Sequence, residues 1–146
     1  MAYWLMKSEP DAWSWDQQVK KGARGELWSG VRNHTAKQNL MKMKKGDRAF
    51  FYHSNIGKEI VGIMKVVAPA HPDSTAEPND KGKVVWECVD VVHHTRMPKP
   101  VTLETIKKTP ELANMALVRL SRLSVSPVTD AEWKLICQMG GLKKAP

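Results

Sequence analysis

The sequence predicts an α+β fold in which helices flank a curled, largely antiparallel sheet of five or six strands. Short runs rich in aromatic and β-branched residues recur along the chain, which is the pattern of half-buried and buried strands. Helix-capping residues stand between several of these runs. The predicted order is a strand, helices, a hairpin, a long strand, helices, a strand and a helix, and such mixed connections favour the α+β class.

The N-terminal segment predicts a strand followed by a short helix. Residues 3–7 form an aromatic-rich strand, which Pro10 ends because proline has no N–H to donate to a neighbouring strand. Ser14 and Gln17 then have the spacing of a capping box. We therefore expect a helix over residues 15–20.

A second helix and a central hairpin come next. Asn33 is a favourable N-cap for a helix over residues 34–43, whose apolar side chains fall on one face. Residues 48–53 and 59–67 predict the two strands of the hairpin. Gly62, inside the second strand, indicates a bulge or the close approach of another group.

The second half of the chain predicts a surface loop over residues 69–83 and then a strand over 84–93 that Pro98 and Pro100 stop. Thr102 and Thr109 are predicted N-caps of two helices, with Pro110 at the first position of the second. A strand over 117–123 and a C-terminal helix over 130–139 follow. Thr129 and Glu132 form a capping box for this last helix, which Gly140 closes.

Length and composition predict one domain, residues 1–146, that buries a core without disulfides or metals. No apolar run is long enough to cross a bilayer, and the N-terminus lacks the pattern of a signal peptide, so we expect a cytoplasmic protein without a membrane partner. Cys88 and Cys137 are far apart and form no C-x-x-C, which predicts two buried thiols. A monomer is favoured.

Charge and tryptophan content point to a polyanionic partner. The chain has 23 basic and 15 acidic residues, a net charge of +8, with the basic excess in its two flanking thirds. Such a surface favours nucleic acid, although a merely well-solvated surface is the alternative. Six tryptophans are present, four of them within the first 28 residues. Tryptophan beside basic residues is typical of sites where bases stack.

Five stretches resemble, in order, the motifs of the EVE domain family. They are residues 3–10, residues 27–33, residues 46–54 with 60–63, residues 86–91, and residues 119–125. The resemblance covers residues 2–142 and implies a PUA-like β-pseudobarrel, related to the PUA, ASCH and YTH domains. It also implies recognition of a modified base in DNA or RNA. A YTH-like arrangement would place Lys7, Ser8 and Trp28 around that base.

A pocket for a flipped base needs a flat wall, polar groups for the base edge and cations for the phosphates. The pocket candidates are Lys7, Ser8, Glu9, Trp13, Trp28, Asn33, His53 and Ser54. Trp28 is the first candidate for the wall, and Trp13 or Trp15 for a second wall. Four of them have a purely structural alternative: Trp28 as core, Ser8 as a turn residue, Asn33 as a helix cap and His53 as a buried or rim histidine.

The candidates for contact with the nucleic-acid backbone are Arg32, Lys37, Arg119 and Arg122. Such cations bind phosphates whatever the base sequence. For each of them, a solvated surface charge is the alternative.

The sequence offers little for catalysis. Lys7 and Ser8 are adjacent in a strand and point to opposite faces, so they cannot form a dyad, and the pair His53 and Ser54 fails in the same way. No P-loop, dinucleotide fingerprint or zinc-deaminase motif occurs. We expect a reader without catalytic residues, metal or cofactor. The alternatives are a hydrolase acting on a modified base or nucleotide, and a module that recruits another protein.

Overall fold

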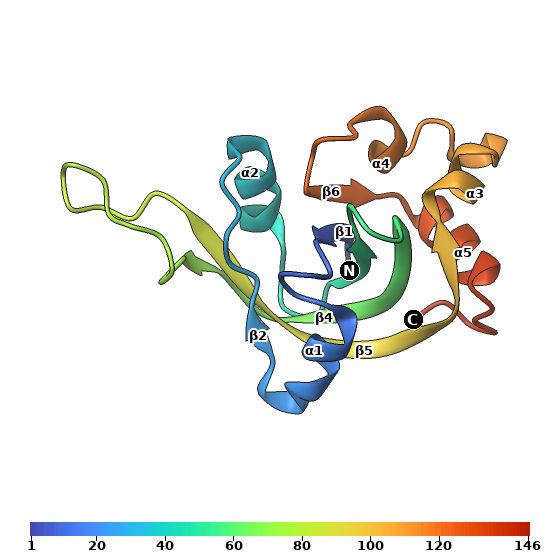
Figure 1. The fold of residues 1–146 in the computed structure, drawn as a ribbon, viewed down its shortest axis with the longest axis horizontal. Coiled ribbons are helices and arrows are strands. Elements are labelled where there is room, and N and C mark those ends of the chain that lie inside the picture. The colour runs from blue at the N-terminus through green and yellow to red at the C-terminus, as the bar shows by residue number, and fades with distance from the viewer.

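A computed structural model describes residues 1–146. One sheet contains six strands in the order β2-β5-β4-β3-β1-β6 (Figure 1). The strands are β1 (Tyr3–Ser8), β2 (Glu26–Leu27), β3 (Arg48–His53), β4 (Glu59–Pro72), β5 (Glu87–Thr102) and β6 (Val125–Val128). The α-helices are α1 (Trp15–Lys20), α2 (His34–Lys42), α3 (Leu103–Lys107), α4 (Ala116–Arg119) and α5 (Asp130–Met139).

The sheet is strongly curved and almost wholly antiparallel. Only β1 and β3 pair in parallel. The long strands β4 and β5 bend around the short central strands, with α1 and α2 on one side and α3, α4 and α5 on the other (Figure 1). The predicted curled α+β pseudobarrel with flanking helices is confirmed.

Alternation along the central strands divides the core between the two faces of the sheet. In β1, Trp4 and Met6 belong to one cluster while Leu5 belongs to the other. In β3, Phe51 and Phe50 divide in the same way. Both faces are therefore covered, which explains the uninterrupted run of buried residues 49–52 in β3.

The predicted helix caps at Ser14, Asn33 and Thr129 are confirmed. The side chain of Ser14 accepts from the backbone N–H of Gln17 in a capping box, and Thr129 begins α5 in the same way. The side chain of Asn33 accepts a hydrogen bond from the backbone N–H of Ala36 at 2.9 Å and so begins α2.

Gly62 has the close approach that the sequence indicated. A Cβ atom at Gly62 would lie 2.5 Å from ring atoms of Trp15, the first residue of α1. The pairing of β4 with β5 also shifts between Ile60 and Gly62. The absent side chain therefore makes room for the Trp15 indole against the sheet.

The prediction that prolines stop the long strand was wrong. β5 begins at Glu87 and runs to Thr102, past Pro98 and Pro100. β2 pairs with β5 only at Asp90 and Val91, so the later part of β5 is an edge. An edge strand tolerates proline because its outward N–H groups need no partner in the sheet.

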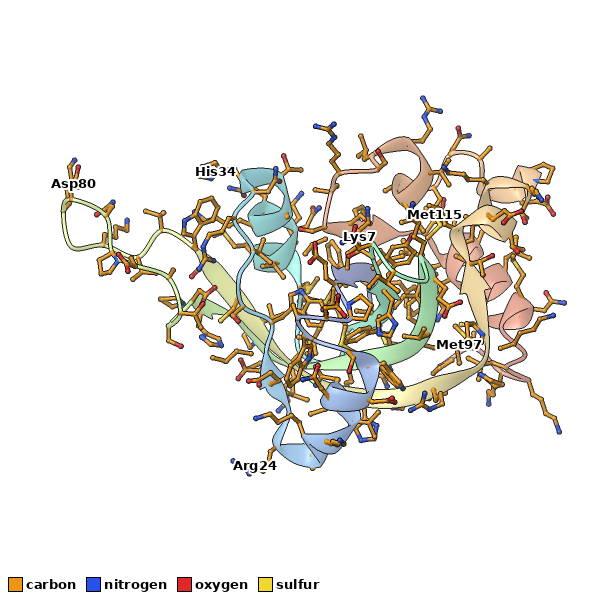
Figure 2. All side chains as sticks on the ribbon, in the orientation of Figure 1. Lys7, Arg24, His34, Asp80, Met97 and Met115 are labelled. Carbon is orange, nitrogen blue, oxygen red and sulfur yellow. The ribbon has the colours of Figure 1, made fainter.

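Two other expectations are corrected. Residues 117–123 are not a strand: Ala116–Arg119 form α4, a turn comes next, and the strand is β6. A short apolar run does not by itself separate strand from helix. The loop predicted from residue 69 begins later, because β4 continues to Pro72. Residues 73–86 then project from the body as an arm with Asp80 at its far end (Figure 2).

No helix has both the length and the apolar character that crossing a membrane requires.

Candidate functional site

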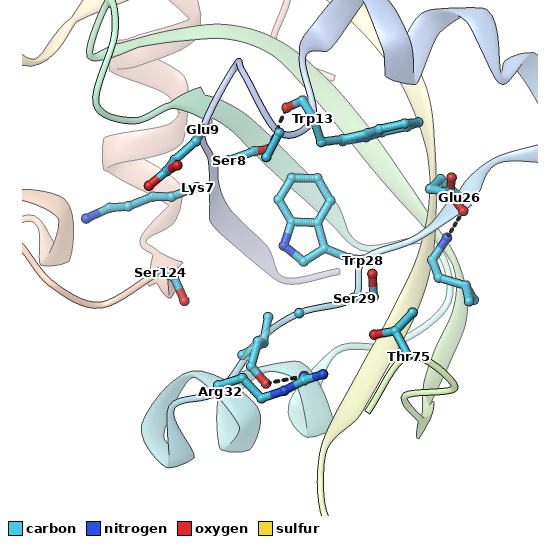
Figure 3. A pocket seen from close by; sticks show the side chains of 14 residues that line it. Lys7, Ser8, Glu9, Trp13, Glu26, Trp28, Ser29, Arg32, Thr75 and Ser124 are labelled. Atoms are coloured by element: carbon cyan, nitrogen blue, oxygen red, sulfur yellow. Dashed lines mark hydrogen bonds between the residues drawn. The ribbon is translucent and has the colours of Figure 1, made fainter. Parts of the chain in front are cut away.

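A cavity of about 590 Å³ opens where the end of β1 faces the segment between β2 and α2 (Figure 3). Its lining comprises Lys7, Ser8, Glu9, Ala12, Trp13, Glu26, Leu27, Trp28, Ser29, Gly30, Val31, Arg32, Thr75 and Ser124. The volume lies within the range of small-ligand sites, about 300–1,000 Å³. The cavity combines two indoles with hydroxyl, carboxylate and cationic groups.

Trp13 forms one wall and is held from two sides. The Ser8 hydroxyl donates to the Trp13 carbonyl at 2.5 Å, and the backbone N–H of Trp13 donates to the Glu9 carbonyl at 2.9 Å. The indole N–H donates to Gln18 at 2.9 Å, and the buried Gln18 amide in turn donates to the Val91 carbonyl. The Trp13 ring is therefore fixed before any ligand arrives.

Trp28 forms the second wall. Its backbone N–H donates to the Val89 carbonyl at 2.8 Å, which extends the pairing of β2 with β5. Phe51 meets the Trp28 ring edge to face, with centroids 5.3 Å apart and an interplanar angle of 86°. Trp28 is only 6% exposed, yet it lies centrally among the cavity side chains, with Trp13 beyond its upper edge in Figure 3. Its indole N–H has no hydrogen-bond partner in the protein and is available to a ligand.

Asp73, the first residue of the arm, orders the rim of the cavity. Its carboxylate accepts from the Gly30 N–H at 2.9 Å, from the Arg32 guanidinium at 3.0 Å, and from the hydroxyl and backbone N–H of Thr75 at 2.6 and 2.8 Å. Burial raises the pKa of Asp73, but these hydrogen bonds outweigh burial and bring the pKa down to about 2. Gly30 has a φ of +83°, a conformation that glycine adopts freely.

Lys7 and Ser124 form the side of the cavity next to β1. The backbone N–H of Lys7 donates to the Ser124 carbonyl at 2.9 Å, and the Lys7 ammonium donates to the Ser121 carbonyl at 2.7 Å. Burial lowers the pKa of Lys7. In Figure 3 the Lys7 side chain points away from Trp28, so its charge lies at the boundary of the cavity.

The polar groups of the rim suit the edge of a nucleobase. Glu9 is exposed and can accept from an exocyclic amine, while the hydroxyls of Ser29 and Ser124 can donate or accept. Glu26 is less available, because it accepts from the Leu27 N–H and faces Lys21 at 3.4 Å.

Six of the residues predicted for the site line this cavity: Lys7, Ser8, Glu9, Trp13, Trp28 and Arg32. The Arg32 charge is directed to Asp73 at 3.0 Å. Asn33 and Arg122 line a separate hollow of about 350 Å³, and Ser54 lines another together with Lys7.

Trp15, the alternative second wall, lines none of these hollows, because it is buried against Gly62. Three further predicted residues also line none of them. His53 accepts a hydrogen bond from the backbone N–H of Trp15 at 3.1 Å, and its pKa is lowered mainly by burial. Lys37 is a half-buried residue of α2, and Arg119 donates to the Asn114 side chain at 2.9 Å.

Asp73, Thr75, Ser29 and Ser124 were missed by the sequence analysis. The spacing of Asp73 and Thr75 is typical of an Asx-type turn, which is a purely local signal. Nothing in the sequence links that turn to Gly30 and Arg32, which are more than forty positions away.

One cysteine, one histidine and one aspartate meet outside the cavity. The donor atoms of His71, Cys88 and Asp90 lie within 4.8 Å of one another, so these are the side chains that can share a metal ion. His71 and Asp90 already pair at 2.8 Å. Burial, together with nearby carboxylates, raises the pKa of Cys88 to about 11. This buried thiol stays protonated at neutral pH and is a poor nucleophile.

Known proteins resemble this chain over nearly its whole length. Mouse thymocyte nuclear protein 1 is 35% identical over 164 residues, covering 94% of this chain and 73% of that protein. The NMR structure of a Rhodopseudomonas palustris protein is 56% identical with a TM-score of 0.90, covering 99% of this chain and 96% of that one. Human THYN1, solved in complex with 5-methylcytosine containing DNA, is 30% identical with a TM-score of 0.87 and full coverage of both chains, 100%.

A YTH domain of Zygosaccharomyces rouxii has the same fold at a TM-score of 0.57 and 16% identity, covering 99% of this chain and 87% of that one. The family model of the EVE domain matches residues 2–139. This match, together with the relatives at 30% identity or more, identifies the chain as a member of the EVE domain family.

Proposed function

We propose that this protein is a non-catalytic reader that binds one flipped, modified base of a nucleic acid in the cavity between Trp13 and Trp28. The observation that carries the proposal is the combination in one cavity of two fixed indoles, unpaired edge groups and a rim with cations. These are the wall, the donors and acceptors, and the phosphate contacts that such recognition requires.

The energetics explain why the polar groups are needed. Extruding a base from its stack costs a few kcal/mol, and stacking on an aromatic side chain returns about 1–3 kcal/mol. Stacking alone is therefore close to neutral. The surplus has to come from hydrogen bonds to the base edge, for which Glu9, Ser29 and the Trp28 N–H are available, and from contacts with phosphates.

The modified base we propose first is 5-methylcytosine in DNA. Human THYN1 forms a complex with 5-methylcytosine containing DNA, and that protein shares the fold of this chain along its whole length. The exposed carboxylate of Glu9 is suited to accept from the exocyclic amine of cytosine. An apolar wall also favours an added methyl group, because burying a methyl group stabilises the complex.

Two features support a reader over an enzyme. The cavity contains no side chain pair with the geometry of a nucleophile and its base. The cysteine nearest a histidine, Cys88, is fully buried and protonated, and it lies outside the cavity. We also infer a monomeric state and a cytoplasmic location, both of which stay predictions of the sequence.

Quantitative binding tests the proposal. Fluorescence anisotropy should compare duplexes that differ only by one 5-methylcytosine, and then matched single strands and RNAs. We expect preference for the modified oligonucleotide and a dependence on salt concentration, which a module that recruits only proteins would lack. Mass spectrometry of the oligonucleotide after long incubation should find it unchanged. Turnover would contradict the reader, and equal affinity for all oligonucleotides would contradict base recognition.

A further inference from the structure

A second hollow lies next to the cavity and shares Lys7 with it. Its volume is about 320 Å³. It is lined by Lys7, Tyr52, Ser54, Asn55, Lys58, Leu103, Lys107, Leu117 and Ser121. We call it the lysine pocket. Its three cations come from three different elements: the end of β1, the turn before β4 and the end of α3.

The lysine pocket carries three positive charges. Lys58 and Lys107 also line a neighbouring hollow whose one carboxylate, Glu104, pairs with Lys108. No carboxylate lines the lysine pocket itself, and neither Lys58 nor Lys107 forms an ion pair. The next residue of the chain provides a contrast, because Lys108 pairs with Glu104 at 2.9 Å. Like charges around a concave surface repel one another and produce a positive potential that an anion relieves.

The walls of the lysine pocket are fixed by backbone contacts. The Lys58 carbonyl accepts from the Leu103 N–H at 2.9 Å, and the Ser121 carbonyl accepts from the Lys7 ammonium at 2.7 Å. Asn55 and Lys58 have φ angles of 71° and 49°, the only non-glycine residues with positive φ. Such conformations are strained for residues other than glycine and gather where ligands bind.

The lysine pocket and the cavity are joined directly. Ser54, which lines the pocket, donates its backbone N–H to the carbonyl of Ser8, which lines the cavity, at 2.9 Å. Lys7 lines both hollows. A base in the cavity stays attached to its strand, and a phosphate next to that base is within reach of the cavity rim, of which Lys7 forms a part. Lysine ammonium groups and serine hydroxyls are the usual partners of such a phosphate.

We propose that the lysine pocket binds a phosphate of the nucleic-acid strand whose base occupies the cavity. Lys58 and Lys107 hold the phosphate oxygens, Lys7 adds its charge from the shared wall, and the Ser54 hydroxyl is available as a donor. This inference rests on the proposed function, since the occupied cavity fixes which phosphate arrives. The pocket then sets the position of the strand without reading its sequence.

The test compares two lysines of the pocket with Lys108, which directly follows Lys107 in the chain. Lys107→Gln and Lys58→Gln remove a charge and keep most of the side-chain stem, and Lys108→Gln is the matched control outside the pocket. The affinity for a labelled 5-methylcytosine duplex is measured between about 50 and about 200 mM salt. Each pocket variant should lower the steepness of log K against log salt concentration by about 0.9. The ratio of the affinities at about 50 and about 200 mM salt then becomes about threefold smaller than in the wild type.

The ratio of affinities for methylated and plain duplex should stay at the wild-type value in both pocket variants, while Lys108→Gln leaves the slope unchanged. Both pocket variants could instead show the same salt slope as Lys108→Gln while the wild type still prefers the methylated duplex. That result would rule out the phosphate site and leave the proposed reader function intact. If the wild type binds no oligonucleotide, the proposed function fails. In that case, inorganic phosphate that shifts the amide NMR signals of Ser54 and Lys58 would identify a free-phosphate site and overturn the strand contact.

Discussion

Two buried tryptophans, one on each face of the sheet, have different surroundings. Trp133 of α5 is fully buried and stacks nearly parallel with two rings, that of Tyr3 at 4.4 Å and that of Phe50 at 3.9 Å. Trp28 is 6% exposed, but its aromatic contact is the edge-to-face one with Phe51. The exposed fraction hardly separates them. The groups that cover the ring decide whether an indole can still accept a ligand.

The largest expected effect is on the closed face. Trp133→Ala should lower the free energy of unfolding by about 3–5 kcal/mol, because it removes a fully buried ring that stacks with two others. Urea denaturation measures this loss. The folded fraction of the variant should bind the methylated duplex with wild-type affinity. Weaker binding by fully folded Trp133→Ala would contradict the assignment of binding to the face that contains Trp28.

Trp28→Ala should separate stability from binding in the opposite way. Loss of a stacking partner should weaken binding of the methylated duplex by about 1–3 kcal/mol at every salt concentration. The loss of stability should be smaller than for Trp133→Ala, because the cavity already leaves part of the ring without protein contacts. Unchanged affinity in a folded Trp28→Ala protein would assign Trp28 to the core.

Asp73→Asn should disorder the rim of the cavity while leaving both tryptophans in place. The neutral side chain loses charged hydrogen bonds to Gly30, Arg32 and Thr75, each of the kind worth about 1.5–3 kcal/mol. We expect weaker binding and higher hydrogen-exchange rates at the Gly30 and Thr75 amides. Unchanged exchange at both amides would show that the rim does not depend on this carboxylate.

Acid should act in the same direction as Asp73→Asn. The pKa of Asp73 falls from 3.8 to about 2 in the folded protein, so the carboxylate stabilises the fold fully above pH 4. That contribution, of about 2 kcal/mol, is lost as the pH falls through the folded-state value. Unfolding free energies measured between pH 5 and pH 2 should therefore fall less steeply for Asp73→Asn than for the wild type.

The smallest expected effect concerns the outer surface. Arg122→Gln should lower the salt dependence of binding by about one unit and preserve the preference for the modified base. Arg32→Gln should act differently, because its charge is already paired with Asp73 and its loss disturbs the rim. Arg24→Gln, in an exposed position away from the cavity, is the control (Figure 2). Equal salt slopes for Arg122→Gln and Arg24→Gln would show that Arg122 does not contact the nucleic acid.

The sequence predicted the fold better than the site. Capping boxes at Ser14 and Thr129, and the apolar run of β3, are local signals, and the structure agrees with them. The extent of β5 beyond Pro98 depends on which strand lies next to it, which no local pattern contains. For the same reason, Asp73 was missed: Gly30 and Arg32 reach its carboxylate only in the folded chain, where the base of the arm lies beside the segment between β2 and α2.

The missing side chain at Gly62 has a consequence for the wall of the cavity. The Trp15 ring occupies the space that a methyl group at position 62 would take. α1 therefore packs more closely against the sheet than a residue with a side chain at this position would allow. Trp13 precedes that helix by only two residues and depends on Gln18 within it. The position of the Trp13 indole in the cavity wall therefore depends on how closely α1 packs against β4. A methyl group added at position 62 would displace Trp15, and with it the helix whose Gln18 holds the Trp13 ring.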